Sequence, residues 1–97
     1  MTNEEIYKAI ADKYGIDKMK LVWLEELHEL SAVILQSMRD EGTREESFNI
    51  TDFIEEIVDV EICIDQMKHT LLSHDYYNYA DMRKREKING LPKKLKL

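Results

Sequence analysis

Two segments of the chain carry acidic residues at matching positions. The first, WLEELHELSAVI, contains Glu26 and Glu29, and the second, FIEEIVDVEICI, contains Glu56 and Asp59. In each segment the two acids are three residues apart, which places them on one side of a helix, one turn from each other. Four carboxylates brought together without cations would repel one another, and a hard divalent cation removes that repulsion. The pattern therefore predicts a metal site shared by two helices, with these four residues as metal ligands and catalytic residues.

The surroundings of the acids favour this interpretation. On a helical wheel of about 100° per residue, Glu26 and Glu56 lie about 60° from the centre of an apolar stripe. An isolated carboxylate in an apolar setting is costly unless it is paired or binds a cation. No Lys or Arg occurs between Lys20 and Arg39, or between Arg44 and Lys68. Neither helix supplies a cation at the level of its acids.

The ligand type indicates which metal and which chemistry to expect. Carboxylate oxygens alone favour Mg²⁺, with Mn²⁺ possible, over zinc. Because Mg²⁺ often binds jointly with substrate phosphates, hydrolysis of a phosphate ester or anhydride is the natural expectation. The only cysteine, Cys63, lies on the apolar face, and the sequence has no Gly-rich phosphate loop. Attack by water is therefore favoured over a covalent intermediate.

Two other interpretations of the acids remain open at this stage. They could be the solvated flanks of two amphipathic helices. The segment from Glu25 to His28 is also an ExxH unit, which di-iron helical bundles use twice. The second segment has Val58 where a second histidine would stand, which disfavours the di-iron alternative.

The elements that position these acids are all helical. The scarcity of Pro and Gly and the spacing of apolar residues predict a single all-α domain over residues 1–97. Thr2 and Glu5 form a predicted capping box, Gly15 a helix stop, and Asp17 and Asn49 N-caps. The predicted helices span residues 3–14, 17–38, 49–72 and 75–88, and the polar segment DEGTREESFN is the longest loop.

The apolar positions define the expected core. In the first helix, one narrow face holds Ile6, Ala9, Ile10 and Tyr14. The stripes of the two long helices are centred on Trp23 and Phe53 and contain Leu27, Leu30, Ile34, Ile57, Val60 and Ile64. One hairpin of two such helices cannot bury both stripes, so we expect a helical bundle that is completed by dimerisation.

Charge is distributed unevenly along the chain. The net charge is −6, yet residues 81–97 hold 7 Lys and Arg against 2 acids. An acidic body argues against nucleic acid as a partner, whereas a basic C-terminal tail can meet phosphates. Arg83, Arg85 and Lys87 are the expected substrate-binding residues. The N-terminus lacks a signal-peptide pattern and no apolar run reaches the length of a membrane span, so a cytoplasmic protein with no membrane partner is expected.

The acid motifs resemble those of a known family. Glu25-Glu26-x-x-Glu29 followed by Glu56-x-x-Asp59 is similar to the EExxE…ExxD signature of the MazG-like all-α nucleoside triphosphate pyrophosphohydrolases. The resemblance covers roughly residues 15–72. It implies Mg²⁺-dependent hydrolysis of an NTP or dNTP to the monophosphate and pyrophosphate, in a homodimer or homotetramer. Carried onto this chain, it makes Glu26, Glu29, Glu56 and Asp59 the metal ligands.

Two further functional alternatives follow from the sequence. The chain could be a non-catalytic helical interaction protein, in which the acids are replaceable. It differs from many members of the resembled family at Gln36, where they carry Lys, and in its tail, which leaves nucleotide sensing without turnover as another alternative. A base could stack on Trp23 or on the cluster Tyr76, Tyr77 and Tyr79, and the sequence does not separate these choices.

Overall fold

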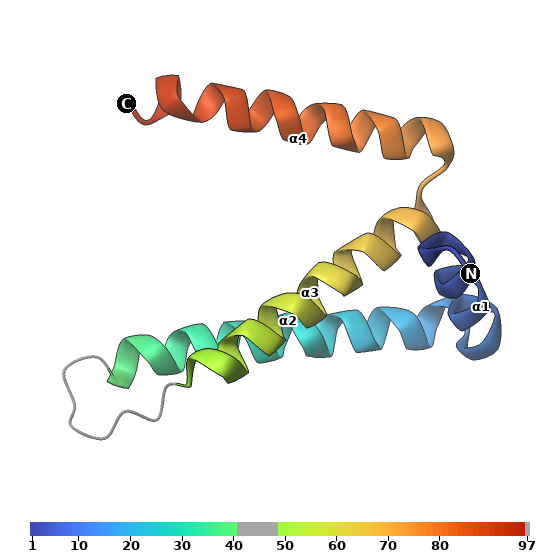
Figure 1. Cartoon of the computed structure of the whole chain (residues 1–97), viewed down its shortest axis with the longest axis horizontal. Helices are drawn as coiled ribbons and strands as arrows, with labels where there is room; N and C mark the ends of the chain where they lie inside the picture. The colour runs from blue at the N-terminus through green and yellow to red at the C-terminus, as the bar shows by residue number, and fades with distance from the viewer. Residues whose placement is uncertain (41–48, 97) are drawn as a thin grey trace.

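The computed structural model describes residues 1–40 and 49–96. This part of the chain forms four helices and no strands: α1 (Asn3–Tyr14), α2 (Ile16–Asp40), α3 (Ile50–Leu71) and α4 (His74–Lys94), shown in Figure 1. The prediction of an all-α chain with four helices is confirmed. The predicted long loop falls almost entirely in residues 41–48, outside the described residues. None of the described helices is long and apolar enough to cross a membrane.

The structure contains the predicted capping hydrogen bonds at the start of α1 and of α3. It also contains the predicted helix stop between α1 and α2. Thr2 Oγ1 accepts a hydrogen bond from the Glu5 amide, and the Glu5 carboxylate accepts one from the Thr2 amide. Gly15 ends α1 with φ 83°, a left-handed conformation that glycine adopts without steric cost. The side chain of Asn49 accepts hydrogen bonds from the Thr51 and Asp52 amides and caps α3.

Two predicted helix boundaries were wrong. Helix α2 begins at Ile16, directly after Gly15, so Asp17 lies in its first turn rather than at the N-cap. Helix α4 continues six residues beyond Ile88, to Lys94. Gly90 is not among the residues with positive φ, so this glycine continues the helix instead of ending it. Pro92 lacks an amide hydrogen, which removes one helical hydrogen bond without ending the helix.

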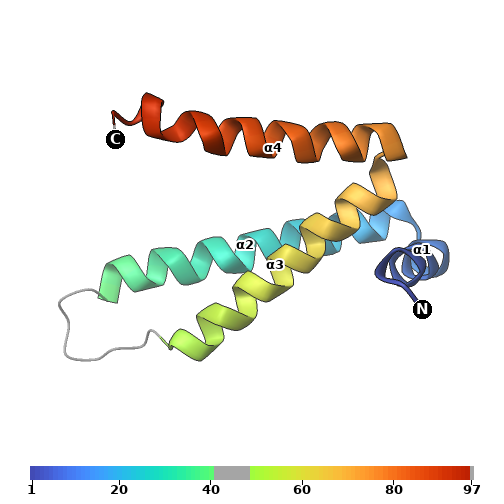
Figure 2. The same cartoon turned by 45° about the horizontal axis from the view of Figure 1, so that its top comes forward.

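Helices α2 and α3 form an antiparallel pair, called the hairpin below, and α1 packs across one end of it (Figures 1 and 2). The buried centre consists of Met19, Trp23 and Cys63. Trp23 is only 3% exposed, and its indole N–H donates to Gln66 Oε1 at 3.1 Å. This pair of side chains fixes the relative position of α2 and α3, and it places Trp23 in the core rather than on a surface where a base could stack.

Helix α4 stands apart from the hairpin in both views (Figures 1 and 2). The radius of gyration is 17.1 Å, whereas a compact domain of this length would have about 12.5 Å. Three residues of the predicted core stripes, Leu27, Ile34 and Ile64, are exposed in the single chain. The stripes are therefore only partly buried within one protomer.

The contact between α1 and α3 includes a hydrogen bond that the sequence did not indicate. Tyr7 is buried, and its hydroxyl donates to Asp65 Oδ2 at 2.8 Å.

We expect Tyr7→Phe to lower the free energy of unfolding by about 1 kcal/mol, because it removes this hydrogen bond and keeps the ring. For a domain of this size that corresponds to roughly 4–8 °C in Tm, measurable by circular dichroism. Tyr14→Phe is the control, and equal Tm values for both variants would show that the bond contributes nothing.

Candidate metal centre

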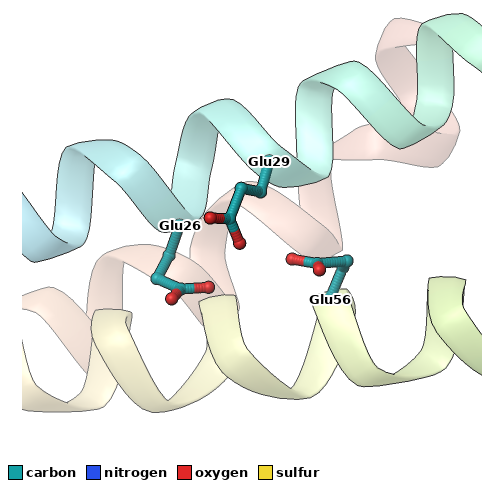
Figure 3. Close-up of side chains that lie close together, drawn as sticks. All are labelled: Glu26, Glu29 and Glu56. Atoms are coloured by element: carbon teal, nitrogen blue, oxygen red, sulfur yellow. The ribbon is translucent and has the colours of Figure 1, made fainter.

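Three of the four predicted ligands come together between α2 and α3. Glu26 and Glu29 project from α2 toward α3, and Glu56 projects from α3 toward them (Figure 3). One carboxylate oxygen of each residue lies within 4.8 Å of one from each of the others. The i, i+3 spacing on α2 aligns the first two residues, and the antiparallel course of α3 brings the third opposite them. These three residues are called the acid cluster below.

Two oxygens of the acid cluster are buried without a hydrogen-bond partner in the described part of the chain. They are Glu26 Oε2 and Glu56 Oε2, each belonging to a side chain that is only partly exposed. Among residues 1–40 and 49–96, none of the ion pairs involves these acids. A buried acceptor without a partner is costly, and the cost is greater for a charged group. The arrangement is thus unfavourable for the protein alone and is suited to a cation.

The electrostatics of the acid cluster also favour a bound cation. Burial raises the pKa of Glu26, and the charges of Glu29, Asp59 and Glu56 raise it further. Burial likewise raises the pKa of Glu56, followed by the charges of Glu29 and Asp59 and a hydrogen bond with Glu29. Two carboxyl groups can share a hydrogen bond only when one of them is protonated. Without a cation, Glu26 and Glu56 therefore hold their protons more tightly than free carboxylates do.

The raised pKa values predict how stability depends on pH without metal. Below the ordinary value of 4.5 both folded and unfolded chains are protonated at Glu56, and no repulsion is present. As the pH rises from 4.5 through the raised pKa, the unfolded chain ionises first, so the folded state loses stability. We expect Glu56→Gln, which lacks this charge, to exceed the wild type in Tm near pH 7.5 in EDTA, and the difference to shrink as the pH falls toward the ordinary value of 4.5. A difference that stays constant with pH would contradict this origin of the repulsion.

Asp59, the fourth predicted ligand, lies at the edge of the site. It does not belong to the group of three whose oxygens are within 4.8 Å, yet its charge raises the pKa of both Glu26 and Glu56. It is close enough to act electrostatically on the acid cluster. Its role as a metal ligand stays a prediction.

The geometry of the acid cluster fits a hard divalent cation. With Mg²⁺–oxygen bonds of about 2.0–2.1 Å, opposite ligands in an octahedron are roughly 4.2 Å apart. Adjacent ligands are about 2.9 Å apart, so three oxygens that lie within 4.8 Å of one another would draw closer around a bound cation. A site of three carboxylates leaves the other positions to water or to phosphate oxygens, as Mg²⁺ commonly requires. Mn²⁺ and Ca²⁺ accept the same oxygen ligands, so the cluster by itself is not specific to one metal.

The predicted substrate-binding cations are not brought to the acid cluster within one chain. Arg83, Arg85 and Lys87 lie on α4, which makes almost no contact with the hairpin. Arg83 pairs with Glu86, and Arg85 pairs with Asp81 at 3.3 Å, along the same helix. In this arrangement two of the three are held by acids of their own helix.

Cys63 lies close to the acid cluster but is not suited to act as a nucleophile. Its side chain is 4% exposed, and burial raises the pKa of its thiol, with smaller contributions from the charges of Glu26 and Asp59. Because the thiolate is the reactive form, this environment makes Cys63 inert. The prediction that Cys63 lies in the apolar core is confirmed.

Comparison of the chain with known protein families, curated proteins and solved structures finds no match. The acid motifs and the geometry of the acid cluster are therefore the basis of the functional proposal that follows.

Proposed function

We propose that the protein is a Mg²⁺-dependent nucleoside triphosphate pyrophosphohydrolase. It cleaves the bond between the α- and β-phosphates of an NTP or dNTP and releases the monophosphate and pyrophosphate. The observation that carries the proposal is the convergence of Glu26, Glu29 and Glu56 on one point, with two buried oxygens that lack partners. The resemblance of these motifs to the MazG-like family supplies the substrate class.

The roles of the residues follow from their positions. Glu26 and Glu56, the two less exposed members of the acid cluster, would hold the cation, and Asp59 lies at the edge of the site. When bound, Mg²⁺ neutralises charge on the triphosphate and activates water for attack on the α-phosphorus. Glu29 is the exposed member, so it can accept a proton from the attacking water and release it to solvent. Because Cys63 is buried and unsuited to act as a nucleophile, the proposed reaction is direct attack by water without a covalent intermediate.

The basic residues of α4 complete the proposal. Pyrophosphate carries several negative charges, which Arg and Lys side chains stabilise strongly. Arg83, Arg85 and Lys87 are the residues that would bind it. Since α4 stands apart from its own hairpin, they reach an acid cluster only after α4 moves or from another protomer.

The active form is proposed to be a homodimer or a homotetramer. The accessible surface of one chain is 8152 Å², whereas a compact monomer of 11.5 kDa would expose about 5,800 Å². The difference is roughly 2,300 Å² per chain, or about 4,600 Å² for two chains, which is within the 2,000–5,000 Å² that obligate interfaces bury in total. A second protomer is therefore the simplest way to cover the excess.

The surface that the second protomer would cover lies on one side of the hairpin. On a helical wheel, the exposed apolar residues of this surface lie about 80° or more from the acids of the same helix. Because α2 and α3 are antiparallel, the exposed apolar residues of both helices lie on the same side of the hairpin. This open face consists of Leu24, Leu27, Ile34, Leu35, Met38, Ile50, Ile54 and Ile64. Pairing two open faces would bring four long helices around one core.

The open face can be tested by introducing a charge. Leu35 is 57% exposed in the single chain, so Leu35→Glu should leave the protomer folded and disrupt the interface. We expect light scattering after size exclusion to show an oligomer for the wild type and a monomer for Leu35→Glu. Ala9→Glu, on the exposed side of α1, is the matched control and should remain oligomeric. A monomeric wild type would contradict the proposed assembly.

The catalytic proposal is tested by an end-point assay over a panel of NTPs and dNTPs, with and without Mg²⁺. The expected products are nucleoside monophosphate and pyrophosphate, formed only with Mg²⁺. Release of diphosphate and phosphate would contradict the proposed bond cleavage. Absence of any turnover would contradict the enzymatic function.

One observation favours a second candidate, a non-catalytic helical interaction protein. Helix α4 has no buried residue and exposes Tyr76, Tyr79, Ile88 and Leu91 although it is a well-formed helix. Such a helix is suited to dock on another protein. Under this candidate, removing a carboxylate from the acid cluster would leave function unchanged.

A further inference from the structure

A pocket of about 400 Å³ lies where α1 crosses the end of the hairpin. This volume is within the roughly 300–1,000 Å³ typical of small-molecule sites. Most of its lining is apolar, with a few polar groups, as such sites usually have. The pocket, called the α1 pocket below, is lined by Ile10, Tyr14, Lys18, Met19, Val22 and Gln66.

The α1 pocket and the acid cluster lie on the same face of the hairpin. Val22 is four residues before Glu26 and Met19 is seven before it, so all three share one side of α2. On α3, Gln66 is seven residues after Asp59, so these two residues lie on the same side of the helix. At about 1.5 Å per residue, the α2 lining of the pocket begins about 6 Å from the level of Glu26, at Val22, and extends to about 12 Å, at Lys18. One extended ligand can span this distance.

The lining chemistry suits a flat heterocycle. The Tyr14 ring is 48% exposed, and the ammonium groups of Lys13 and Lys18 each lie 5.2 Å from its centroid. Gln66 is buried, and its Oε1 accepts the indole hydrogen of Trp23, which fixes the amide and leaves its nitrogen as a donor. The site therefore combines an aromatic face, a fixed amide and apolar walls.

We propose that the α1 pocket binds the nucleobase of the nucleoside triphosphate, stacked against Tyr14, with the Gln66 amide at the edge of the base. This inference rests on the proposed function, since it assigns the other end of the same substrate. The sugar and the α-phosphate extend from the pocket along the hairpin to the acid cluster. Lys18, at the rim, faces the negative charge of the substrate.

The other aromatic residues are less suited to this role. Trp23 is buried and its N–H is already bonded. Tyr77 contacts the ring of His69 at 5.0 Å between centroids. Tyr76 and Tyr79 are exposed on α4, which stands apart from the hairpin. Among the described aromatic residues, only Tyr14 combines a half-exposed ring with a pocket on the face of the acids.

Calorimetric titration separates this inference from the proposed function. The ligands are Mg²⁺ complexes of nonhydrolysable nucleoside triphosphates with each common base, and Mg²⁺ tripolyphosphate, which lacks a base. For the base that binds most tightly, we expect Tyr14→Ala to weaken binding about 5- to 150-fold, the range that one lost stacking contact gives. Binding of tripolyphosphate should change less than twofold. The matched control, Tyr79→Ala, should change neither.

Each outcome decides one of the two proposals. Equal weakening of nucleotide and tripolyphosphate by Tyr14→Ala, or no weakening of either, would overturn the base assignment, whatever the hydrolysis assay shows. Weakening by Tyr79→Ala alone would place the base on α4 and would also overturn it. Nucleotide binding that depends on Tyr14 in a protein without hydrolytic activity would support the pocket and reject the enzyme. A wild type that binds no nucleotide would reject both.

Discussion

Glu56→Gln is expected to lose most of the pyrophosphohydrolase activity while it keeps its fold. Gln has nearly the shape of Glu but lacks the charge, so it would hold a divalent cation poorly. Removing one well-placed electrostatic group from an active site typically costs about 10²–10³ in kcat. Glu56 faces both Glu26 and Glu29 across the hairpin, and we therefore expect a loss of at least about 100-fold (Figure 3).

The adjacent residue offers a matched control for this variant. Glu55 is exposed on α3 and is not part of the acid cluster, so Glu55→Gln makes the same chemical change on the solvent side of the same helix. It should retain activity within about twofold, as surface substitutions usually do. Helicity and oligomer size are measured for both variants. Full activity in Glu56→Gln would end the metal-site proposal, and equal losses in both variants would indicate a nonspecific effect of charge.

The helices could be predicted because their signals are local. Capping at Thr2 and Asn49 and the left-handed Gly15 depend on neighbouring residues alone, and each appears as predicted. The end of α4 could not be predicted from local signals. Asn89, Gly90 and Pro92 form a stop signal, but an exposed helix tolerates both glycine and one missing hydrogen bond, so α4 continues to Lys94.

The acid cluster was predictable from periodicity, and the contacts of α1 were not. Matching i, i+3 pairs on two helices converge when the helices pack with those faces toward each other, which is how Glu26, Glu29 and Glu56 meet. The burial of Tyr7 depends on where α1 crosses the hairpin, and no periodicity within α1 reveals that. The face predicted for α1 was consequently only partly right, since Ile6, Ala9 and Tyr14 are exposed. The α1 pocket results from the same crossing.

Mg²⁺ should stabilise the protein, and Glu26→Gln should stabilise it without metal. A cation that binds only the folded state at ten times its Kd adds about 1.4 kcal/mol, or roughly 5–10 °C in Tm for a domain of this size. Glu26→Gln removes a charge that four neighbouring carboxylates repel, so its Tm in EDTA should exceed that of the wild type. The Mg²⁺-dependent shift should then be smaller, because a ligand has been lost.

Differential scanning fluorimetry measures both effects, with NaCl at matched ionic strength as a control because salt also screens repulsion. Glu55→Gln should resemble the wild type in EDTA and in Mg²⁺. Equal shifts with NaCl and MgCl₂ in all three proteins would mean that the carboxylates are only a solvated face. The expected pattern is instead that Glu26→Gln raises the Tm of the metal-free protein and reduces its response to Mg²⁺. That combination identifies a charge that destabilises the empty protein and is retained for binding.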